Sequence, residues 1–125
     1  MSTTFPAENQ LVLELFVRDF ARSMSFYRAL GFAVEREEPG FAVLRWQRCE
    51  LLIQASAKLG EVPPRPASNL RILVDDVDAK WELAQTLRAP VFVPIGDREY
   101  GLRDFIVSDP DGFGVRFASP LPARH

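Results

Sequence analysis

Two stretches of this sequence share one pattern: LELFVRDFARSMSFYRAL at residues 13–30 and, 57 positions later, LRILVDDVDAKWELAQTL at residues 70–87. Each begins with an apolar-rich segment that is typical of a strand. Each then has an aspartate, Asp19 or Asp76, in the position of a helix N-cap, where its carboxylate can accept backbone N–H groups. A segment with the apolar spacing of a helix follows each aspartate. The chain therefore contains an internal repeat.

Three short strand-like runs follow each predicted helix. They cover residues 32–37, 40–47 and 50–55 in the first half, and 91–94, 102–107 and 112–117 in the second. Gly31 is placed to end the first helix, and the proline-rich residues 56–68 are typical of a connector. We therefore predict one α+β domain, residues 1–125, with two β-α-β-β-β modules. Module one covers about residues 10–56 and module two about 69–118, and together they form a curved mixed sheet with the helices on its outer face.

Composition and charge exclude several classes of protein. The formal net charge is −2 with both signs spread along the chain, whereas a nucleic-acid-binding protein typically carries a basic stripe. Apolar runs fall far short of the ~20 residues that span a bilayer, and no signal-peptide pattern is visible. Lone Cys49 cannot form an internal disulfide or a thiolate zinc site. We expect a cytoplasmic protein without nucleic-acid or membrane partners.

The chain has a single histidine, and it is the last residue, His125. A Ser-His-Asp triad and the common histidine-containing metal sites need an imidazole held in the folded core. Nothing follows His125 in the sequence that could hold it there. Histidine-based catalysis and histidine metal ligation are therefore not expected.

Alternate residues of the predicted strands separate two faces. One face is apolar and is expected to pack on the helices: Leu13, Leu15, Val17, Leu51, Ile53, Leu70, Ile72, Val74, Phe113, Val115 and Phe117. The other is mixed: Val12, Glu14, Phe16, Glu50, Leu52, Gln54, Asn69, Arg71, Leu73, Gly114 and Arg116. A solvated face would lack the large apolar residues, and a second core would lack the charges. The mixed face is predicted to line a ligand cup, with a partly solvated face or a dimer surface as alternatives.

The sequence resembles the vicinal oxygen chelate superfamily, which includes glyoxalase I, extradiol dioxygenases, fosfomycin-resistance enzymes and bleomycin-resistance proteins. The resemblance covers about residues 11–119. It depends on residues 17–32 (VRDFARSMSFYRALGF) and on residues 100–105 (YGLRDF), which are followed by DPDG at 109–112. The second motif is closest to the bleomycin-resistance branch. The resemblance implies a cup-shaped sheet with the ligand or metal inside, and a homodimer.

The metal-binding branches of that superfamily place ligands at four repeated positions, which correspond here to Val12, Gln54, Asn69 and Arg116. Val12 has no donor atom, Arg116 is positively charged where the metal enzymes have glutamate, and two neutral amides are weak ligands. We therefore expect no metal and no other cofactor. Metal-dependent glyoxalase, dioxygenase or fosfomycin-transferase activity is not expected either.

The predicted ligand-binding residues are seven residues of the mixed face together with two aromatic residues. Glu14 is expected to face Arg116 or Arg71, either to orient a ligand or as an ion pair with no role in recognition. Phe41 and Tyr100 are candidate stacking walls, because the resemblance places an aromatic residue at each position; Trp46 is a third candidate, or a residue of the core or interface. The predicted set is Glu14, Phe16, Phe41, Leu52, Gln54, Asn69, Arg71, Tyr100 and Arg116.

Three functional hypotheses follow. The first is a metal-independent binding protein that sequesters a flat amphipathic small molecule, such as a bleomycin-like antibiotic, in a homodimer. The second is a metal-independent lyase or isomerase on the same scaffold, with Glu14 as general base and Arg71 or Arg116 stabilising an oxyanion. The third is a dimerisation module without a ligand, in which Glu14 and the arginines pair internally.

Overall fold

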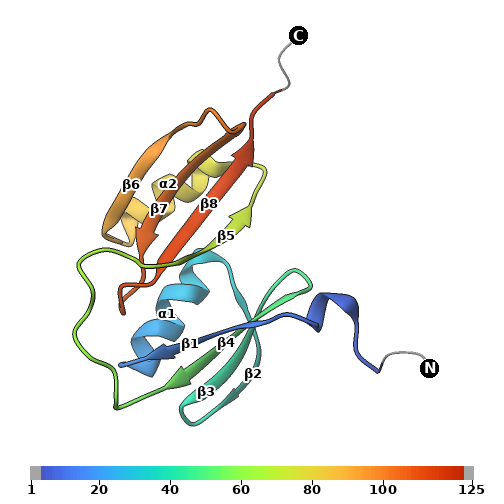
Figure 1. Cartoon of the computed structure of the whole chain (residues 1–125). Coiled ribbons are helices and arrows are strands. Elements are labelled where there is room, and N and C mark those ends of the chain that lie inside the picture. Colours follow the sequence, from blue (N-terminus) through green and yellow to red (C-terminus); the bar gives the residue numbers. More distant parts are fainter. Residues whose placement is uncertain (1–3, 123–125) are drawn as a thin grey trace. The chain divides into compact units, whose positions relative to one another are not determined.

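The computed structural model describes residues 4–122, and His125 lies outside them. The chain divides into two compact units between residues 60 and 61, one for each predicted module. Each unit holds a four-stranded sheet with one helix, as the ribbons in Figure 1 show. The α+β class and the repeated β-α-β-β-β order that the sequence predicts are confirmed.

The first unit begins with a short 3-10 helix, Ala7–Asn9, and continues with β1 (Leu13–Val17) and α1 (Phe20–Leu30). The strands β2 (Ala33–Glu38), β3 (Phe41–Trp46) and β4 (Cys49–Ala55) follow. The sheet order is β1-β4-β3-β2, in which β1 runs parallel to β4 and the other pairs are antiparallel. The crossover through α1 therefore places the first and last strands of the module side by side.

The second unit repeats this topology. Its elements are β5 (Asn69–Leu73), α2 (Val77–Thr86), β6 (Val91–Asp97), β7 (Leu102–Ser108) and β8 (Gly114–Pro120). The sheet order is β5-β8-β7-β6, and β5 is parallel to β8 as β1 is to β4. Within residues 4–122 no helix has the length and apolar character needed to cross a membrane.

Both predicted N-caps are present. The Asp19 side chain accepts a hydrogen bond from the Arg22 N–H at 3.0 Å, and the Asp76 side chain accepts one from the Ala79 N–H at 3.1 Å. Gly31, with φ 123°, ends α1 in a backbone conformation that other residues rarely adopt. These local signals fix where each helix starts and where α1 ends, and so set which side chains turn toward the sheet.

The core of each unit lies between its helix and one face of its sheet. In the first unit the rings of Tyr27, Phe32 and Trp46 pack edge to face, with centroids 5.5 Å and 5.1 Å apart. In the second, Trp81 packs on Phe105 in the same way at 5.1 Å. The apolar face predicted from alternation is buried at residues 15, 17, 51, 53, 72, 115 and 117, whereas Leu13 is 40% exposed. Trp46 thus contacts the core aromatics.

Two strands differ from their predicted limits by more than one residue at an end. β6 does not end at Pro94 but continues to Asp97, because register shifts between β6 and β7 accommodate a residue that lacks a backbone donor. β8 begins at Gly114 and not at Gly112, since Gly112 has φ 84° and belongs to the turn. The buried Asp109 carboxylate closes this turn by accepting the N–H groups of Asp111 and Phe113, each at 2.8 Å.

Gly112→Ala is expected to destabilise the protein for two reasons. The substitution puts a side chain at positive φ, which costs about 1 kcal/mol, and the new Cβ would lie only 2.8 Å from the Pro63 ring. Gly101→Ala is the matched control, since it has φ 91° and nothing within 4 Å of the added Cβ. Urea denaturation should show a larger loss of unfolding free energy for Gly112→Ala; equal losses would contradict a close approach of the connector at this turn.

Candidate functional site

Each sheet has an open face opposite its helix, and this face carries the mixed residues predicted from alternation. On the first sheet the register aligns Glu14 with Leu52 and Phe16 with Gln54 across β1 and β4. Phe41 aligns with Gln54 across β3 and β4. Phe16 is 52% exposed although it is aromatic, while its neighbours Leu15 and Val17 are buried under α1. The open face thus combines apolar surface with polar groups, as a ligand site requires.

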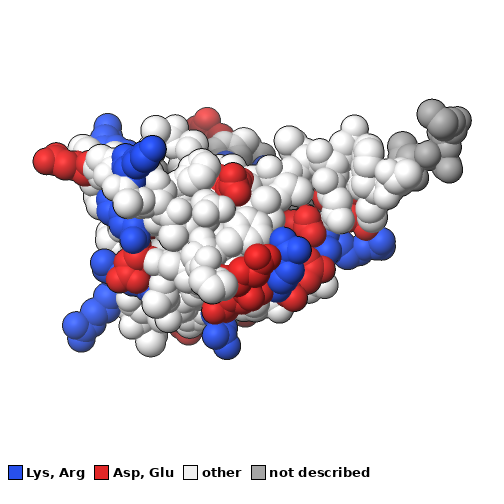
Figure 2. Space-filling view, turned by 90° about the horizontal axis from the view of Figure 1, so that it is seen from below, with Lys and Arg blue, Asp and Glu red and all other residues white. Residues whose placement is uncertain are grey.

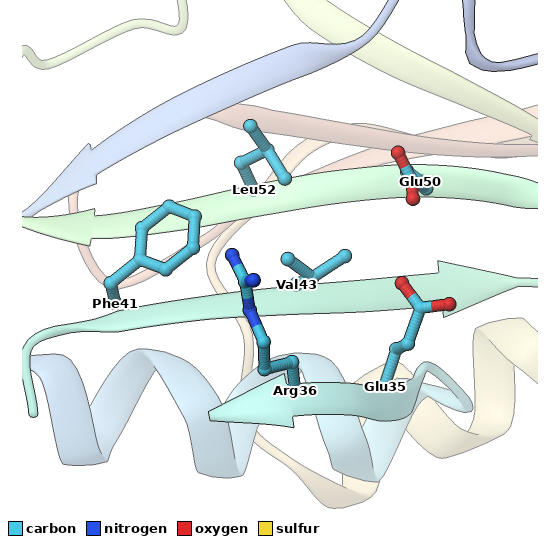
Figure 3. A pocket seen from close by; sticks show the side chains of 6 residues that line it. All are labelled: Glu35, Arg36, Phe41, Val43, Glu50 and Leu52. Carbon is cyan, nitrogen blue, oxygen red and sulfur yellow. The ribbon is translucent and has the colours of Figure 1, made fainter. Parts of the chain in front are cut away.

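A hollow of about 520 Å³ lies on this open face of the first unit. It is lined by Glu35, Arg36, Phe41, Val43, Glu50 and Leu52. Figure 3 shows the Phe41 ring at one end, the carboxylates of Glu35 and Glu50 at the other, and Val43 and Leu52 between them. The hollow therefore has an aromatic end, an aliphatic floor and an acidic end.

The acidic end is organised by one arginine. The Arg45 guanidinium donates from Nε to Glu35 at 2.7 Å and from Nη2 to Glu50 at 3.0 Å. The hydrogen bond to Glu35 is the main reason why the pKa of Arg45 is raised above its ordinary value. Two carboxylates thus share one guanidinium, which leaves this end acidic while its side chains are held in place.

The aromatic end carries a cation of its own. The Arg36 guanidinium carbon lies 5.6 Å from the centroid of the Phe41 ring, a cation–π distance. Arg36 is also within 3.5 Å of Glu38, and both side chains are more than half exposed. Because an exposed pair of this kind holds a side chain weakly, a ligand ring can take the place of Arg36 on Phe41 at little cost.

Charged groups of both signs are interspersed on the surface. Figure 2 shows acidic and basic side chains adjoining at several places on the face seen from below. This mixture fits the formal net charge of −2.

The open face of the second unit has a buried aspartate at its centre. Asp104, on β7, is 1% exposed and accepts hydrogen bonds from the side chains of Arg98, Tyr100 and Arg116. The distances are 2.7 Å from Arg98 Nε, 2.6 Å from the Tyr100 hydroxyl, and 2.9 Å and 2.7 Å from Nε and Nη2 of Arg116. A buried carboxylate needs such partners, and here it has three.

The three donors shift the ionisation of this cluster. Burial alone would raise the pKa of Asp104, but the hydrogen bonds from Arg98, Tyr100 and Arg116 outweigh it and hold the pKa below its ordinary value. The hydrogen bond to Asp104 raises the pKa of Tyr100. Asp104 also raises the pKa of Arg116, against the effect of burial. At neutral pH the cluster therefore holds a carboxylate, a neutral phenol and two guanidinium ions.

Tyr100 is fixed by its hydroxyl while its ring stays accessible. The side chain comes from the loop between β6 and β7, is 61% exposed, and has the Arg116 guanidinium carbon 5.3 Å from its ring centroid. Tyr100 and Arg116, which the sequence analysis named separately, meet at Asp104. The prediction that Tyr100 is a stacking wall is not tested by this arrangement.

The structure groups the predicted residues by module. Phe41 and Leu52 line the hollow, and Glu14, Phe16 and Gln54 lie on the adjoining strands of the same face. Asn69 and Arg71 lie on β5, next to Gly114 and Arg116 on β8. Within residues 4–60 no hydrogen bond or ion pair engages Glu14, and its expected pairing with Arg116 or Arg71 stays a prediction. Arg116 already has a carboxylate partner in its own module.

The sequence analysis missed the residues that organise both faces. Asp104 and Arg98 were not named, although an aspartate inside the apolar β7 run is a signal that alternation could have used. Glu35 and Arg36 read from the sequence as a solvated strand edge and were not placed among the site residues, because a register shift between Val34 and Arg36 interrupts the alternation of β2. Arg45, on β3, was not named.

The four positions that carry metal ligands in relatives do not suit a divalent cation here. Val12 offers no donor atom, and Arg116 offers only N–H donors, two of which are taken by Asp104. Among the described residues there is no group of three or more histidine, cysteine, aspartate or glutamate side chains that could hold a metal ion. Val12 and Arg116 therefore supply no ligand atom for a divalent cation at these positions.

Comparison with known proteins gives a consistent family and fold. A model of the Glyoxalase/Bleomycin resistance protein/Dioxygenase superfamily matches residues 9–117. A protein of unknown function from Agrobacterium tumefaciens str. C58 is similar, with 24% identity, a TM-score of 0.78 and coverage of 94% of this chain and 98% of that one. A glyoxalase/bleomycin resistance protein/dioxygenase from Alicyclobacillus acidocaldarius has 22% identity, a TM-score of 0.72 and coverage of 94% and 96%.

A lactoylglutathione lyase from Agrobacterium tumefaciens has 20% identity, a TM-score of 0.70 and coverage of 91% and 95%. No curated protein matches the sequence. At these identities the solved structures show a shared fold, and they do not show a shared chemistry.

Asp104→Asn is expected to lower the unfolding free energy at pH 7 by about 3 kcal/mol, because it leaves two partly buried guanidinium groups without their carboxylate. The lowered pKa of Asp104 means that its charge stabilises the fold above the ordinary aspartate pKa of about 3.9, and that this stabilisation is lost as the pH falls below that value. Denaturation between pH 7 and pH 3 should therefore show a smaller acid dependence for Asp104→Asn. Asp97→Asn, which removes an exposed partner of Arg103, is the control; equal effects of the two variants would contradict the role assigned to Asp104.

Proposed function

The chain belongs to the Glyoxalase/Bleomycin resistance protein/Dioxygenase superfamily, and from this premise we propose that it is a metal-independent small-molecule binding protein that sequesters a flat amphipathic ligand. The observation that carries the proposal is the hollow of the first unit, in which an aromatic end and an acidic end are joined by an aliphatic floor. A binding protein needs a surface that contacts the ligand in this way, and it does not need a side chain that reacts with the ligand.

The hollow matches a planar ligand with a cationic end. A ring stacked on Phe41 would replace the weakly held Arg36 and bury apolar area on Val43 and Leu52. A cationic group at the other end of the ligand would lie near Glu35 and Glu50. These two carboxylates share a single guanidinium, that of Arg45. Cationic heteroaromatic antibiotics of the bleomycin kind have this combination of groups, which supports the bleomycin-resistance branch of the superfamily.

Metal independence is supported by the donor set. Arg116 brings a positive charge to a position where a metal site needs a negative one, and the Asp104 contacts keep it in place. Val12 contributes no ligand atom at all. Binding by shape, stacking and charge accounts for the residues present without a metal.

A homodimer is part of the proposal. β1 is an edge strand of its sheet; its first residue, Leu13, is 40% exposed, and Leu11 just before it is 91% exposed. An edge strand with exposed leucines is protected when a second chain covers it.

A metal-independent lyase or isomerase is the second candidate, and one observation favours it. Glu14 lies one strand away from the hollow, beside Leu52, and is not engaged by another side chain of residues 4–60. A carboxylate in that position can act as a general base toward a bound carbonyl compound.

Phe41→Leu is expected to weaken the binding of bleomycin and of a planar cationic acridine by about tenfold, because it removes the aromatic stack while keeping an apolar side chain. Fluorescence or calorimetric titration measures the effect. Phe5→Leu, which changes another exposed aromatic residue of the same unit, should leave the affinity unchanged. The proposal is wrong if neither probe binds, or if the two variants weaken binding equally.

Glu14→Gln separates the binder from the enzyme. If the chain is a binder, this variant should leave acridine affinity within about twofold of the native value, because Glu14 is exposed and outside the lining of the hollow. If the chain is an enzyme, turnover of a panel of α-hydroxy and α-keto carbonyl compounds should be lost while binding persists. Turnover by the native chain that disappears only in Glu14→Gln would replace the first candidate by the second.

A further inference from the structure

Two arginines lie side by side on the open face of the second unit. Arg71 on β5 and Arg116 on β8 are register partners across parallel strands, so their backbones are separated by the strand spacing of about 4.8 Å. Like charges directly across a strand pair repel and lower stability. An anion close to both side chains would therefore stabilise such a pair.

Both side chains project from the open face. Ile72 and Phe117, which follow Arg71 and Arg116 in their strands, are buried on the helix side. Alternation then directs Arg71 and Arg116 to the opposite face together. Arg71 is exposed, and Arg116 is largely buried but still accessible, with 21% of its side chain exposed.

The protein's own anion on this face satisfies only part of the positive charge. Asp104 is the one carboxylate at the described open-face positions of β5, β7 and β8, and it is shared by Arg98 and Arg116. Among residues 61–122, Arg71 has no partner in a hydrogen bond or an ion pair. One negative charge thus faces three guanidinium ions, so the face carries a local positive surplus within a chain of net charge −2.

Arg116 is held in a fixed orientation by Asp104, and its Nη1 takes no part in the two hydrogen bonds to that carboxylate. Its Nε and Nη2 both donate to Asp104, and its guanidinium carbon is 5.3 Å from the centroid of the Tyr100 ring. The Nη1 side is not used by the carboxylate. A guanidinium fixed in this way loses little conformational entropy when it binds a second anion.

We infer that the open face of the second unit is an anion-binding site, in which Arg71 and Arg116 together hold the carboxylate or phosphate group of a small molecule. Asp104 and Tyr100 are positioning residues that fix Arg116, and Arg71 supplies the second, uncommitted guanidinium. Two arginines are suited to a planar carboxylate or a phosphate because each can donate paired N–H groups. The inference goes beyond the proposed function, because it assigns a separate site on the second unit to a different chemical group.

The test uses small probes that lack the cationic ring. Benzoate and phenyl phosphate are titrated into the native chain, with benzamide as the neutral analogue of benzoate, and amide and arginine Nε–H resonances are followed by NMR. We expect both anions to shift the signals of β5 and β8 and of Arg71, and benzamide to leave them unmoved. The tighter of the two anions identifies the group.

Arg71→Gln should weaken the binding of the preferred anion by about tenfold, since it removes one of two charge-assisted contacts. Arg88→Gln is the matched control, because it removes the same charge from an exposed position elsewhere in the second unit. Binding should also weaken as sodium chloride is raised. Equal binding of benzoate and benzamide, no binding of either anion, or equal effects of the two variants would overturn the inference.

The two proposals can fail separately. Loss of acridine binding in Phe41→Leu together with normal benzoate binding supports both of them. Benzoate binding at Arg71 without any acridine or bleomycin binding would keep the anion site and remove the flat cationic ligand. Acridine binding that depends on Phe41, with no anion binding, would remove the anion site alone.

Discussion

The arrangement of each unit depends on one constraint: a sheet covered by a single helix buries one face and leaves the other open. Leu15 and Val17 are buried under α1, so Glu14 and Phe16 between them have to point outward. The same alternation sends Arg71 and Arg116 outward around the buried Ile72 and Phe117. Packing on the helix thus decides which residues are available to a ligand, before any property of the ligand is considered.

The two open faces use charge in different ways. In the first unit Arg45 is shared by Glu35 and Glu50 near solvent, so the carboxylates outnumber the cation. In the second, Asp104 is buried and shared by Arg98 and Arg116, so the cations outnumber the carboxylate. Exposed pairs contribute little to stability, whereas a buried carboxylate is costly unless every partner is present. Loss of Asp104 from the second face is therefore expected to lower stability more than loss of Glu35 from the first.

The fold could be predicted from the sequence because the patterns that specify it are local and regular. The N-caps Asp19 and Asp76, the stop at Gly31 and the period-two strands all act within a few residues. The candidate site could be predicted only in part, because the contacts that hold its side chains in place do not follow these regular patterns. The shift beside Arg36 interrupts the alternation of β2, and Tyr100 reaches Asp104 from a loop. Phe41 and Leu52 could be named from pattern and resemblance, while Asp104 needed the register of β7 against β8.

The same position in a fold can attract opposite charges, depending on which side chain stands there. Where the resemblance places a glutamate ligand in metal-binding relatives, this chain has Arg116, and Asp104 holds the guanidinium in place. A carboxylate there attracts a divalent cation, and through it the oxygen atoms of a substrate. A guanidinium can contact an anionic group directly, without a metal between them. In the site proposed above, this difference of one side chain would let the face bind an oxygen anion directly, without the Lewis-acid chemistry that a metal supplies.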